Sequence, residues 1–394
     1  MDTSIFAFAT DFADEGIETV LDNVERRGGL GGVTVAAAYH EGRDVFPHNP
    51  VRKVRFLEGG AVFFRPDEAR WRSVRLRPPV SEVAHVLPEV VHAAGRRGLA
   101  VRAWTVFLHN GALADAHPDC APENAYGDRY VTDLCPAHPD VQAFARALAA
   151  DVAGLGVATI CAESLHYHPL EHGYAHERYF VPLGLRSRFL LGLCFCSHCL
   201  EAAHDHGVDG EVMRRLARRE LDRVFAGGSE EPVEELERGS LEELEGYLGV
   251  RERIVTSLVE EVAEATREGG AELEIIDSSG AMKGYATGRP TGAPAPTVAW
   301  QLGVDVGAVA RVSDGIEAIG YAADPARIRG DLDAYGDAAV SIVLRPTPPD
   351  CDSADNLRAK VAVARERGLR RVDFYHYGFM RLDALDWIRR AVEP

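Results

Sequence analysis

Three of the seven cysteines lie close together in residues 193–200. Cys194, Cys196 and Cys199 form a C-x-C-x-x-C pattern, whose spacing lets three sulfur atoms reach one tetrahedral metal ion. Cys135 is the best candidate for a fourth ligand, because it precedes a predicted helix at the same end of the fold. Four thiolates that leave no open coordination position are typical of structural zinc. The sequence therefore predicts a structural Zn2+ on these four residues.

Two alternatives to this zinc site stay open. The fourth ligand could be an imidazole from the surrounding histidines, namely His172, His176, His198, His204 or His206. The cluster could also consist of three reduced, partly buried thiols without a metal. A disulfide framework is disfavoured, because the cysteine count is odd and the N-terminus lacks the pattern of a secretion signal.

Two carboxylates stand where predicted strands end. Glu163 follows an apolar run at 157–162, and Asp277 ends the next run at 273–277. Glycoside hydrolysis requires two carboxyl groups that flank the scissile bond. Neighbouring strands lie about 5 Å apart, so both groups could share one pocket, where their repulsion would keep one protonated near neutral pH. The alternatives are a salt-bridged rim residue for Glu163 and a turn cap for Asp277.

Hydrogen-bonding and aromatic side chains follow most of the other predicted strands. Such a rim suits a polyhydroxylated ligand, since sugars need both hydrogen bonds and aromatic faces. The guanidinium of Arg345 also matches a carboxylate or sulfate group on a sugar. Tyr39, Tyr375 and Tyr377 belong to the same rim. The predicted substrate contacts are Asp11, His40, His109, Asn110, His166, Tyr321, Arg345 and His376.

The stretch directly after Glu163 is dense in histidine. His166 and His168 stand two residues apart, a spacing compatible with a second, catalytic metal. A substrate-contacting loop is favoured, because no carboxylate at a regular metal spacing joins them. The sequence contains no H-E-x-x-H signature, no glycine-rich phosphate loop after a predicted strand and no nucleophile elbow.

The scaffold must bring these strand ends together. Short apolar runs alternate with amphipathic stretches, which predicts a parallel sheet. Eight such repeats match an α/β fold of the (β/α)8 TIM-barrel type, with its chemistry at the carboxyl ends of the strands; an open doubly wound sheet is the alternative. We expect one domain over 1–394, with a β-hairpin at 51–64 after strand two and a long insertion at 166–250 after strand four. The predicted strands are residues 5–10, 32–39, 100–107, 157–162, 273–277, 315–320, 339–344 and 372–376.

Composition narrows the class of protein. Hydrophobic residues make up 46% of the 394 residues, enough for a sizeable core. The net charge of -18 argues against nucleic acids and anionic membranes as partners. No apolar run approaches the ~20 residues of a membrane span, so we expect a cytoplasmic protein. The acidic excess and the scarcity of lysine favour a halophilic source, and a GC-rich genome is the alternative cause of the arginine bias.

The order of these motifs resembles the catalytic barrel of glycoside hydrolase family 42 β-galactosidases and of related uncharacterised glycosyl-hydrolase-like proteins. In that family a Cys-Pro segment opens the helix after strand three, a glutamate ends strand four, and a C-x-C-x-x-C run completes a four-cysteine zinc site. This chain has Cys135-Pro136, then Glu163, then the cysteine pattern, in the same order within residues 127–207. The resemblance implies that Glu163 is the general acid/base.

Two positions depart from the family pattern. Ala162 stands where the family has an asparagine before the acid/base, and strand seven leads into Arg345 without the family's nucleophilic glutamate. The second carboxyl group would then come from Asp277 or from another rim acid, such as Asp11 or Asp324. The β-galactosidase activity itself is not carried over to this chain.

The sequence thus predicts a glycoside hydrolase that acts on a glycoside or oligosaccharide through Glu163 and Asp277 and carries a structural zinc. One rival is a metal-dependent lyase, isomerase or hydrolase that uses the histidines after Glu163. The other is a carbohydrate-binding barrel without catalysis, which the missing glutamate of strand seven keeps open. The oligomeric state is not set by the sequence, and a homo-oligomer is compatible with it.

Overall fold

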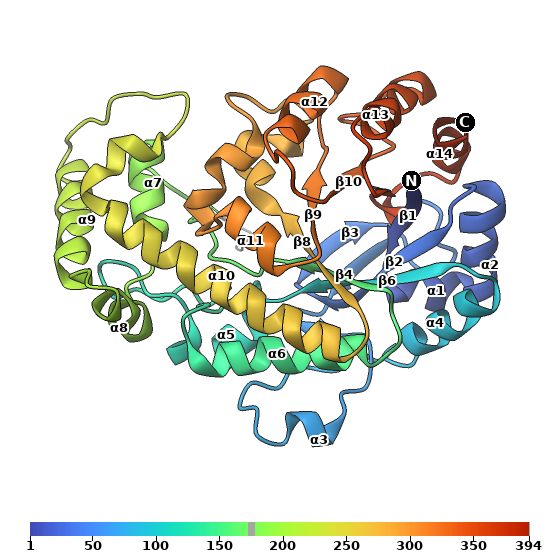
Figure 1. The fold of residues 1–394 in the computed structure, drawn as a ribbon, viewed down its shortest axis with the longest axis horizontal. Helices are drawn as coiled ribbons and strands as arrows, with labels where there is room; N and C mark the ends of the chain where they lie inside the picture. Colours follow the sequence, from blue (N-terminus) through green and yellow to red (C-terminus); the bar gives the residue numbers. More distant parts are fainter. Residues whose placement is uncertain (172–177, 394) are drawn as a thin grey trace.

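Eight parallel strands close into a barrel in the computed structural model, which describes residues 1–171 and 178–393 (Figure 1). The strands pair in the order β1-β11-β10-β9-β8-β7-β6-β2, and β1 also pairs with β2, so the sheet closes on itself. This confirms the predicted (β/α)8 barrel and excludes the open doubly wound sheet. The strands are β1 (Asp2–Ala7), β2 (Gly32–Tyr39), β6 (Ala100–Val106), β7 (Thr159–Glu163), β8 (Glu272–Asp277), β9 (Gly315–Ile319), β10 (Val340–Leu344) and β11 (Arg371–Phe374).

Burial on both faces explains why the barrel strands appear in the sequence as unbroken apolar runs. All eight residues of β2 and all five residues of β10 are buried. The largest difference from the prediction concerns β1, which was expected at 5–10. This strand ends at Ala7 because the side chain of Asp11 accepts a hydrogen bond from the backbone N–H of Phe8 and caps the helix that follows.

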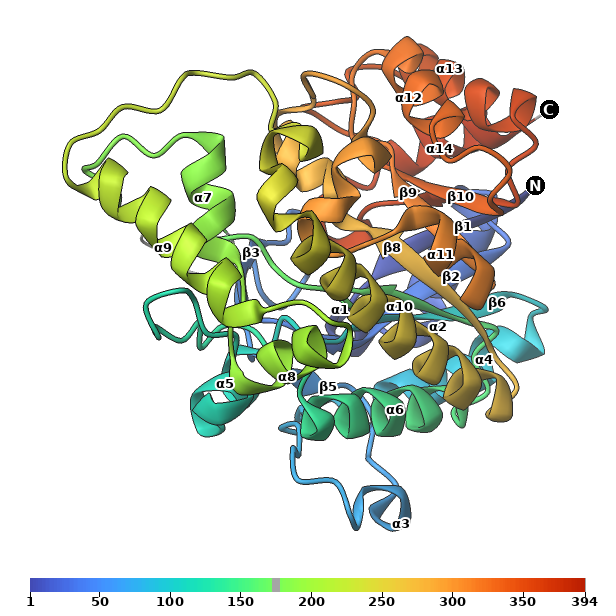
Figure 2. The ribbon, with the colours of Figure 1, turned by 60° about the vertical axis from the view of Figure 1, so that its left-hand side comes forward.

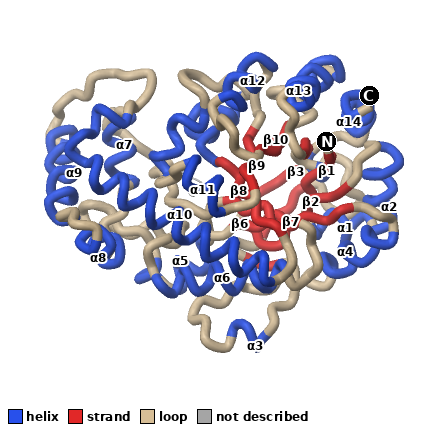
Figure 3. The backbone as a smooth tube through the Cα atoms, in the orientation of Figure 1, coloured by secondary structure: helices blue, strands red, loops and turns tan. Residues whose placement is uncertain are grey.

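Helices surround the barrel, whose strands lie together in the middle of the molecule (Figure 3). In the described part of the chain, no helix is both long enough and apolar enough to cross a membrane. The helices are α1 (Ala9–Glu15), α2 (Ile17–Asp22), α3 (Glu68–Trp71), α4 (Val86–Arg96), α5 (Gly111–Ala116), α6 (Pro139–Ala153), α7 (Leu185–Gly192), α8 (Ser197–Asp205), α9 (Gly210–Phe225), α10 (Glu245–Glu268), α11 (Val306–Val312), α12 (Pro325–Asp333), α13 (Ala354–Glu366) and α14 (Ala384–Val392).

A β-hairpin follows β2, as predicted, but its strands differ from the prediction. β3 (Gly42–Val45) pairs antiparallel with β4 (Val54–Leu57), and β5 (Ala61–Val62) pairs antiparallel with the end of β2. The hairpin predicted at 51–64 therefore combines two separate features. The reason is burial: β5 is fully buried and extends the main sheet, whereas Phe56 of β4 is exposed.

In its described residues, the chain between β7 and α10 contains the helices α7, α8 and α9. These helices pack around a second hydrophobic cluster that includes Leu193, Phe195 and Tyr247. In Figure 2 these helices stand to one side of the barrel. The long helix α10 begins at Glu245, inside the predicted insertion, and packs against α6 on the outside of the barrel.

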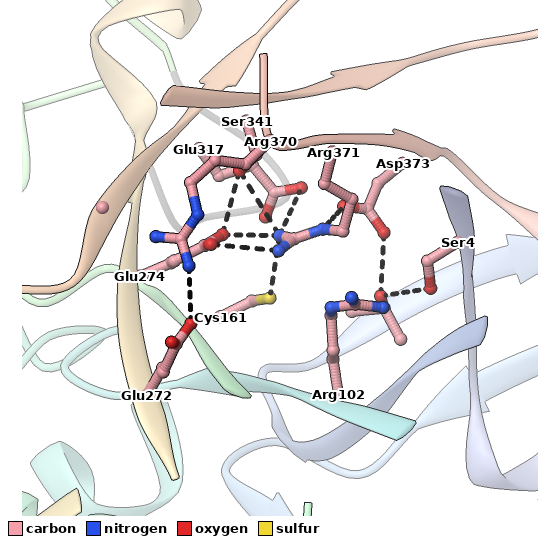
Figure 4. Close-up of polar contacts among 12 residues, drawn as sticks. Ser4, Arg102, Cys161, Glu272, Glu274, Glu317, Ser341, Arg370, Arg371 and Asp373 are labelled. Carbon is pink, nitrogen blue, oxygen red and sulfur yellow. Dashed lines mark hydrogen bonds and ion pairs between the residues drawn. The ribbon is translucent and has the colours of Figure 1, made fainter. Parts of the chain in front are cut away.

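The amino-terminal half of the barrel interior is polar (Figure 4). Arg371 donates to both oxygens of Glu274, with an Nη1–Oε1 distance of 3.0 Å and an Nη2–Oε2 distance of 2.6 Å. Its Nε donates to Asp373, and its Nη2 lies 3.6 Å from Glu317. All four side chains are almost completely buried, so the guanidinium offsets the cost of burying the carboxylates. A charged layer therefore closes this end of the barrel.

Candidate active site

A cavity of about 430 Å³ opens at the carboxyl ends of the barrel strands. Each barrel strand, or the residue directly after it, contributes at least one side chain to the wall, and Glu163 is the carboxylate among them. Parallel barrels carry their chemistry at this end, because the loops that follow the strands meet there. The cavity is lined by Phe6, Tyr39, His40, Trp104, Glu163, Ile276, Tyr285, Ala286, Ile319, Tyr321, Val343, Arg345 and Tyr375.

Glu163 is the last residue of β7 and keeps a partly exposed surface toward the cavity. The indole Nε1 of Trp104 donates a hydrogen bond to its Oε2 at 2.5 Å. Burial of the carboxyl raises the pKa of Glu163, while the indole hydrogen bond and the nearby His109 and His168 act in the opposite direction. The net shift is upward, which favours a carboxyl that holds its proton and can donate it.

Asp277 does not lie in this cavity, although it ends the neighbouring strand β8. Its Oδ1 accepts from the backbone N–H of Ser279 at 2.9 Å, and its Oδ2 accepts from the hydroxyl of Tyr335 at 2.6 Å. Successive strand residues point to opposite faces, and Ile276 is the residue of β8 that lines the cavity. The expectation that Asp277 and Glu163 share one pocket is therefore corrected: Asp277 caps the turn that follows β8.

Arg345 and Tyr321 form the cationic side of the cavity. The guanidinium carbon of Arg345 lies 4.1 Å from the centre of the Tyr321 ring. Its Nε lies 2.7 Å from Oδ1 of the fully buried Asp350, and its Nη2 donates to the backbone oxygen of Tyr285. The guanidinium of Arg345, which was expected to bind an anionic group on a sugar, therefore already has a carboxylate partner in Asp350.

The other predicted substrate contacts divide into two groups. His40 lines the cavity, with its ring 4.8 Å from that of His109. Asp11, Asn110 and His376 are buried outside the cavity wall, and each accepts a backbone N–H where a short helix begins. The structure thus gives these three side chains a capping role.

Asp324 and Tyr377 also lie away from the cavity wall. Asp324 caps α12 by accepting from the backbone N–H of Ala326, and the hydroxyl of Tyr377 donates to Glu15. Of the tyrosines expected at the rim, Tyr39 and Tyr375 line the cavity.

A cluster of imidazoles lies beside the cavity, at the ends of β6 and β7. Nδ1 of His109 lies 2.8 Å from Oδ1 of Asp133, and Nδ1 of His168 lies 3.0 Å from the same oxygen. The His166 ring lies 5.1 Å from that of His168, and its Nδ1 contacts the backbone oxygen of Tyr167 at 2.7 Å. Asp133 therefore joins His109 and His168, and it comes from a segment outside the histidine-rich stretch.

Three residues in or near the cavity were not predicted as site residues from the sequence. Trp104 belongs to the apolar run of β6, so the sequence pattern did not distinguish it from core residues. Its position near the end of a barrel strand is the feature that could have indicated a place in the cavity wall. Asp133 lies outside any strand, two residues before Cys135. Asp44 lies in β3. Burial raises the pKa values of Tyr39 and Tyr375, and the charges of Glu163 and Asp44 raise them further. Burial also raises the pKa of Asp44.

The four predicted cysteines form one buried group that could hold a metal ion. The sulfur of Cys135 lies 3.8, 3.6 and 3.5 Å from those of Cys194, Cys196 and Cys199. Tetrahedral zinc with Zn–S bonds of about 2.3 Å requires sulfurs about 3.8 Å apart, so the donor set fits the ion. Of the proposed histidine alternatives, His198, His204 and His206 are not in this group, and His172 and His176 lie outside the described residues.

Two contacts hold the sulfur atoms in place. The backbone N–H of Glu123 donates to the sulfur of Cys194 at 3.3 Å, and the hydroxyl of Tyr167 lies 3.2 Å from that of Cys199. Hydrogen bonds of this kind orient metal ligands and stabilise thiolates. All seven cysteines are free of disulfides.

No family model matches this sequence, and no curated protein matches it. Solved structures of glycosidases share its fold. A β-galactosidase from the psychrophilic Marinomonas ef1 matches with a TM-score of 0.57 and 12% identity, over 99% of this chain and 58% of the other. An α-L-fucosidase isoenzyme 2 from Paenibacillus thiaminolyticus matches with a TM-score of 0.53 and 12% identity, over 99% of this chain and 49% of the other.

The catalytic domain of a β-amylase from Paenibacillus polymyxa matches over nearly its whole length. The TM-score is 0.53 and the identity 10%, over 100% of this chain and 99% of the other. This chain thus spans about half the length of the fucosidase and the β-galactosidase. The matches confirm the barrel fold and do not single out family 42.

Proposed function

We propose that this protein is a glycoside hydrolase in which Glu163 is the general acid/base. The main support is the setting of Glu163, a carboxyl with a raised pKa in an aromatic-lined cavity at the carboxyl end of the barrel. The likeness in fold to glycosidases adds to this support. The substrate class is a glycoside or oligosaccharide, since the aromatic faces of Phe6, Tyr321 and Tyr375 suit sugar rings.

In this mechanism Glu163 enters the reaction protonated. It donates its proton to the glycosidic oxygen as the bond to the sugar breaks, and in a retaining mechanism it then removes a proton from the incoming water. The indole N–H of Trp104 stabilises the carboxylate that forms after the first transfer, because it donates to Oε2. Trp104 is thus a positioning residue for the proton transfer.

Asp44 is the proposed second carboxyl group. Asp44 does not itself line the cavity; the support for it is that its charge acts on Tyr39 and Tyr375, which both do, whereas both oxygens of Asp277 accept hydrogen bonds outside the cavity. Asp44 would act as the nucleophile or as the base that activates water. Asp277, the residue predicted from the sequence, stays the alternative. The two assignments predict opposite rankings of kcat/KM for Asp44→Asn and Asp277→Asn.

The four-cysteine group is the proposed site of one structural Zn2+. The ion would join the segment before α6 to the loop that carries α8, and it would take no part in the chemistry. Elemental analysis of protein purified without added metal should find one zinc that resists mild chelation and is lost from Cys194→Ser. A zinc content that this substitution leaves unchanged contradicts the assignment.

The deciding experiment is a screen of 4-nitrophenyl glycosides at high and low salt with wild-type protein, Glu163→Gln and Glu272→Gln. Glu272 is exposed at the opposite end of the neighbouring strand, so its variant is the matched control. We expect turnover in wild type and in Glu272→Gln, and a loss of at least about 100-fold in Glu163→Gln. Turnover that Glu163→Gln leaves unchanged contradicts the proposal.

A carbohydrate-binding barrel without catalysis is the second candidate, because the described residues contribute only one carboxylate, Glu163, to the cavity wall. It predicts sugar binding by calorimetry that survives Glu163→Gln, with no turnover of any glycoside by the wild-type protein. Binding together with turnover supports the enzyme.

A further inference from the structure

The cluster beside the cavity contains three metal-ligating side chains from three segments of the chain. His109 follows β6, Asp133 lies between α5 and α6, and His168 follows β7. One ligand atom from each lies within 4.8 Å of the others. Their side chains are at most 6% exposed, so the group is shielded from bulk solvent.

The distances within the cluster are close to those between ligands of one metal ion. Oδ1 of Asp133 lies 2.8 Å from Nδ1 of His109 and 3.0 Å from Nδ1 of His168. Bonds of about 2.05 Å to a tetrahedral zinc place the ligand atoms about 3.3 Å apart, so a small outward movement of these side chains would let them bind one ion. Two imidazole nitrogens and one carboxylate oxygen are a donor set that binds divalent transition metals and leaves coordination positions open.

The surrounding backbone holds the ligands in place. His109 and Asp133 are partners in an antiparallel bridge, flanked by hydrogen bonds from Asn110 N–H to Thr132 and from Leu134 N–H to Leu108. The hydroxyl of Thr132 donates to Oδ2 of Asp133 at 2.8 Å. This bond engages the second carboxylate oxygen and leaves Oδ1 directed at the imidazoles, as outer-shell partners of metal ligands do.

We propose that His109, Asp133 and His168 bind a divalent transition-metal ion such as Zn2+, separate from the four-cysteine group. This inference goes beyond the proposed glycosidase function and does not depend on it. The strand ends that carry His109 and Glu163 are joined by backbone hydrogen bonds from Phe107 to Glu163 and from Leu108 to Ser164. The ion would therefore lie beside the cavity, next to the strand end that carries Glu163.

Metal stoichiometry tests the proposal without any substrate. Metal-free protein is equilibrated with Zn2+ and analysed for bound metal, and the same titration with Co2+ is followed by absorption. We expect two equivalents in wild type, one with the thiolate-to-cobalt charge-transfer band of the cysteine group and one without it. His168→Gln and Asp133→Asn should each lose the second equivalent and keep the first.

Two further variants control for a loss of metal that is caused by misfolding. Thr132→Val removes only the hydrogen bond to Asp133, so it should weaken the second equivalent by about 10- to 100-fold while the thermal melt stays cooperative. His204→Gln, an exposed histidine on α8, should keep both equivalents.

A single bound metal ion per chain in wild type overturns the proposal. Two bound metal ions that persist in Asp133→Asn and His168→Gln overturn it as well. Either result would mean that Asp133 only orients two imidazoles by hydrogen bonds. Failure of the glycosidase proposal appears separately, as absent turnover with the metal counts unaffected.

Discussion

Buried carboxylates occur at both ends of the barrel interior, in opposite electrostatic settings. In the amino-terminal half, Glu274 and Asp373 contact the guanidinium of Arg371 (Figure 4). In the carboxyl-terminal half, Glu163 contacts an indole N–H and faces tyrosine rings. The carboxylates Glu274 and Asp373 thus have a guanidinium as direct partner, whereas Glu163 has the neutral indole N–H of Trp104 as its hydrogen-bond donor.

This difference separates structural carboxylates from reactive ones. The charge of Arg371 keeps the pKa of Asp373 below its ordinary value against the effect of burial, so that carboxyl stays ionised and stabilises the folded barrel. The pKa of Glu163 is raised, so that carboxyl can carry a proton to a substrate. A buried carboxylate is a candidate catalyst when a guanidinium does not already balance it.

The largest effect is expected from removing the reactive carboxyl. Glu163→Ala should lower turnover by about 1,000-fold for glycosides with poor leaving groups, because these need a proton from Glu163. Glycosides with an acidic phenol as leaving group should lose much less, and a steady-state rate comparison of the two kinds checks this. Equal losses for both kinds would remove Glu163 from the role of acid.

The largest effect on stability is expected from removing the cation of the amino-terminal layer. Arg371→Met leaves Glu274 and Asp373 buried without their partner, which should cost about 3–5 kcal/mol in the free energy of unfolding. Urea denaturation measures this, with the exposed Arg358→Met as control at less than about 1 kcal/mol. A loss below 1 kcal/mol for Arg371→Met would show that the layer does not need its cation.

The two candidates for the second carboxyl group give a sharper comparison. Asp44→Asn should lower kcat/KM by roughly 100-fold, since it removes the proposed nucleophile or base. Asp277→Asn keeps an oxygen for the N–H of Ser279 and should change kcat/KM by less than about tenfold. The opposite ranking in parallel assays would return the role to Asp277.

A moderate effect on pH dependence is expected at Trp104. Its hydrogen bond lowers the pKa of Glu163, so Trp104→Phe should raise that pKa further. A general acid loses activity as pH rises through its pKa, and the basic limb of kcat/KM should therefore move to higher pH, by up to about one unit. A basic limb that stays in place or moves down would contradict the role of the indole.

The smallest effect is expected at Glu317, whose pKa is raised well above 4.5 by burial, with Asp373 adding to the shift. The upward shift favours the protonated carboxyl in the folded state, so Glu317→Gln should change stability by less than about 1 kcal/mol near neutral pH. The wild-type group binds its proton more tightly when folded, and its contribution to stability falls as pH rises above its ordinary pKa. Melting temperatures measured from pH 5 to 8 should therefore fall more steeply in wild type than in the variant.

The sequence predicted the scaffold well and placed Glu163 at the end of a barrel strand, and physical reasons limit the rest. Strand runs and the position of Glu163 could be recognised because parallel barrel strands are continuously apolar. In a continuously apolar strand, the sequence does not show which side chains point into the barrel. Residues 273–277 therefore did not indicate that Ile276, and not Asp277, faces the cavity. Asp133 could not be found, because its partners His109 and His168 lie more than twenty residues away along the chain.

The spacing of the cysteines has a consequence for the order of events in folding. Cys135 and Cys194 are 59 residues apart, and β7 with Glu163 lies between them. A single ion on the four sulfurs would close this stretch into a ring, which lowers the entropy of the unfolded chain most for the segment that bears the acid. The reactive strand would then be tethered on both sides before the last strands complete the barrel, and zinc supply during synthesis would govern the yield of active protein.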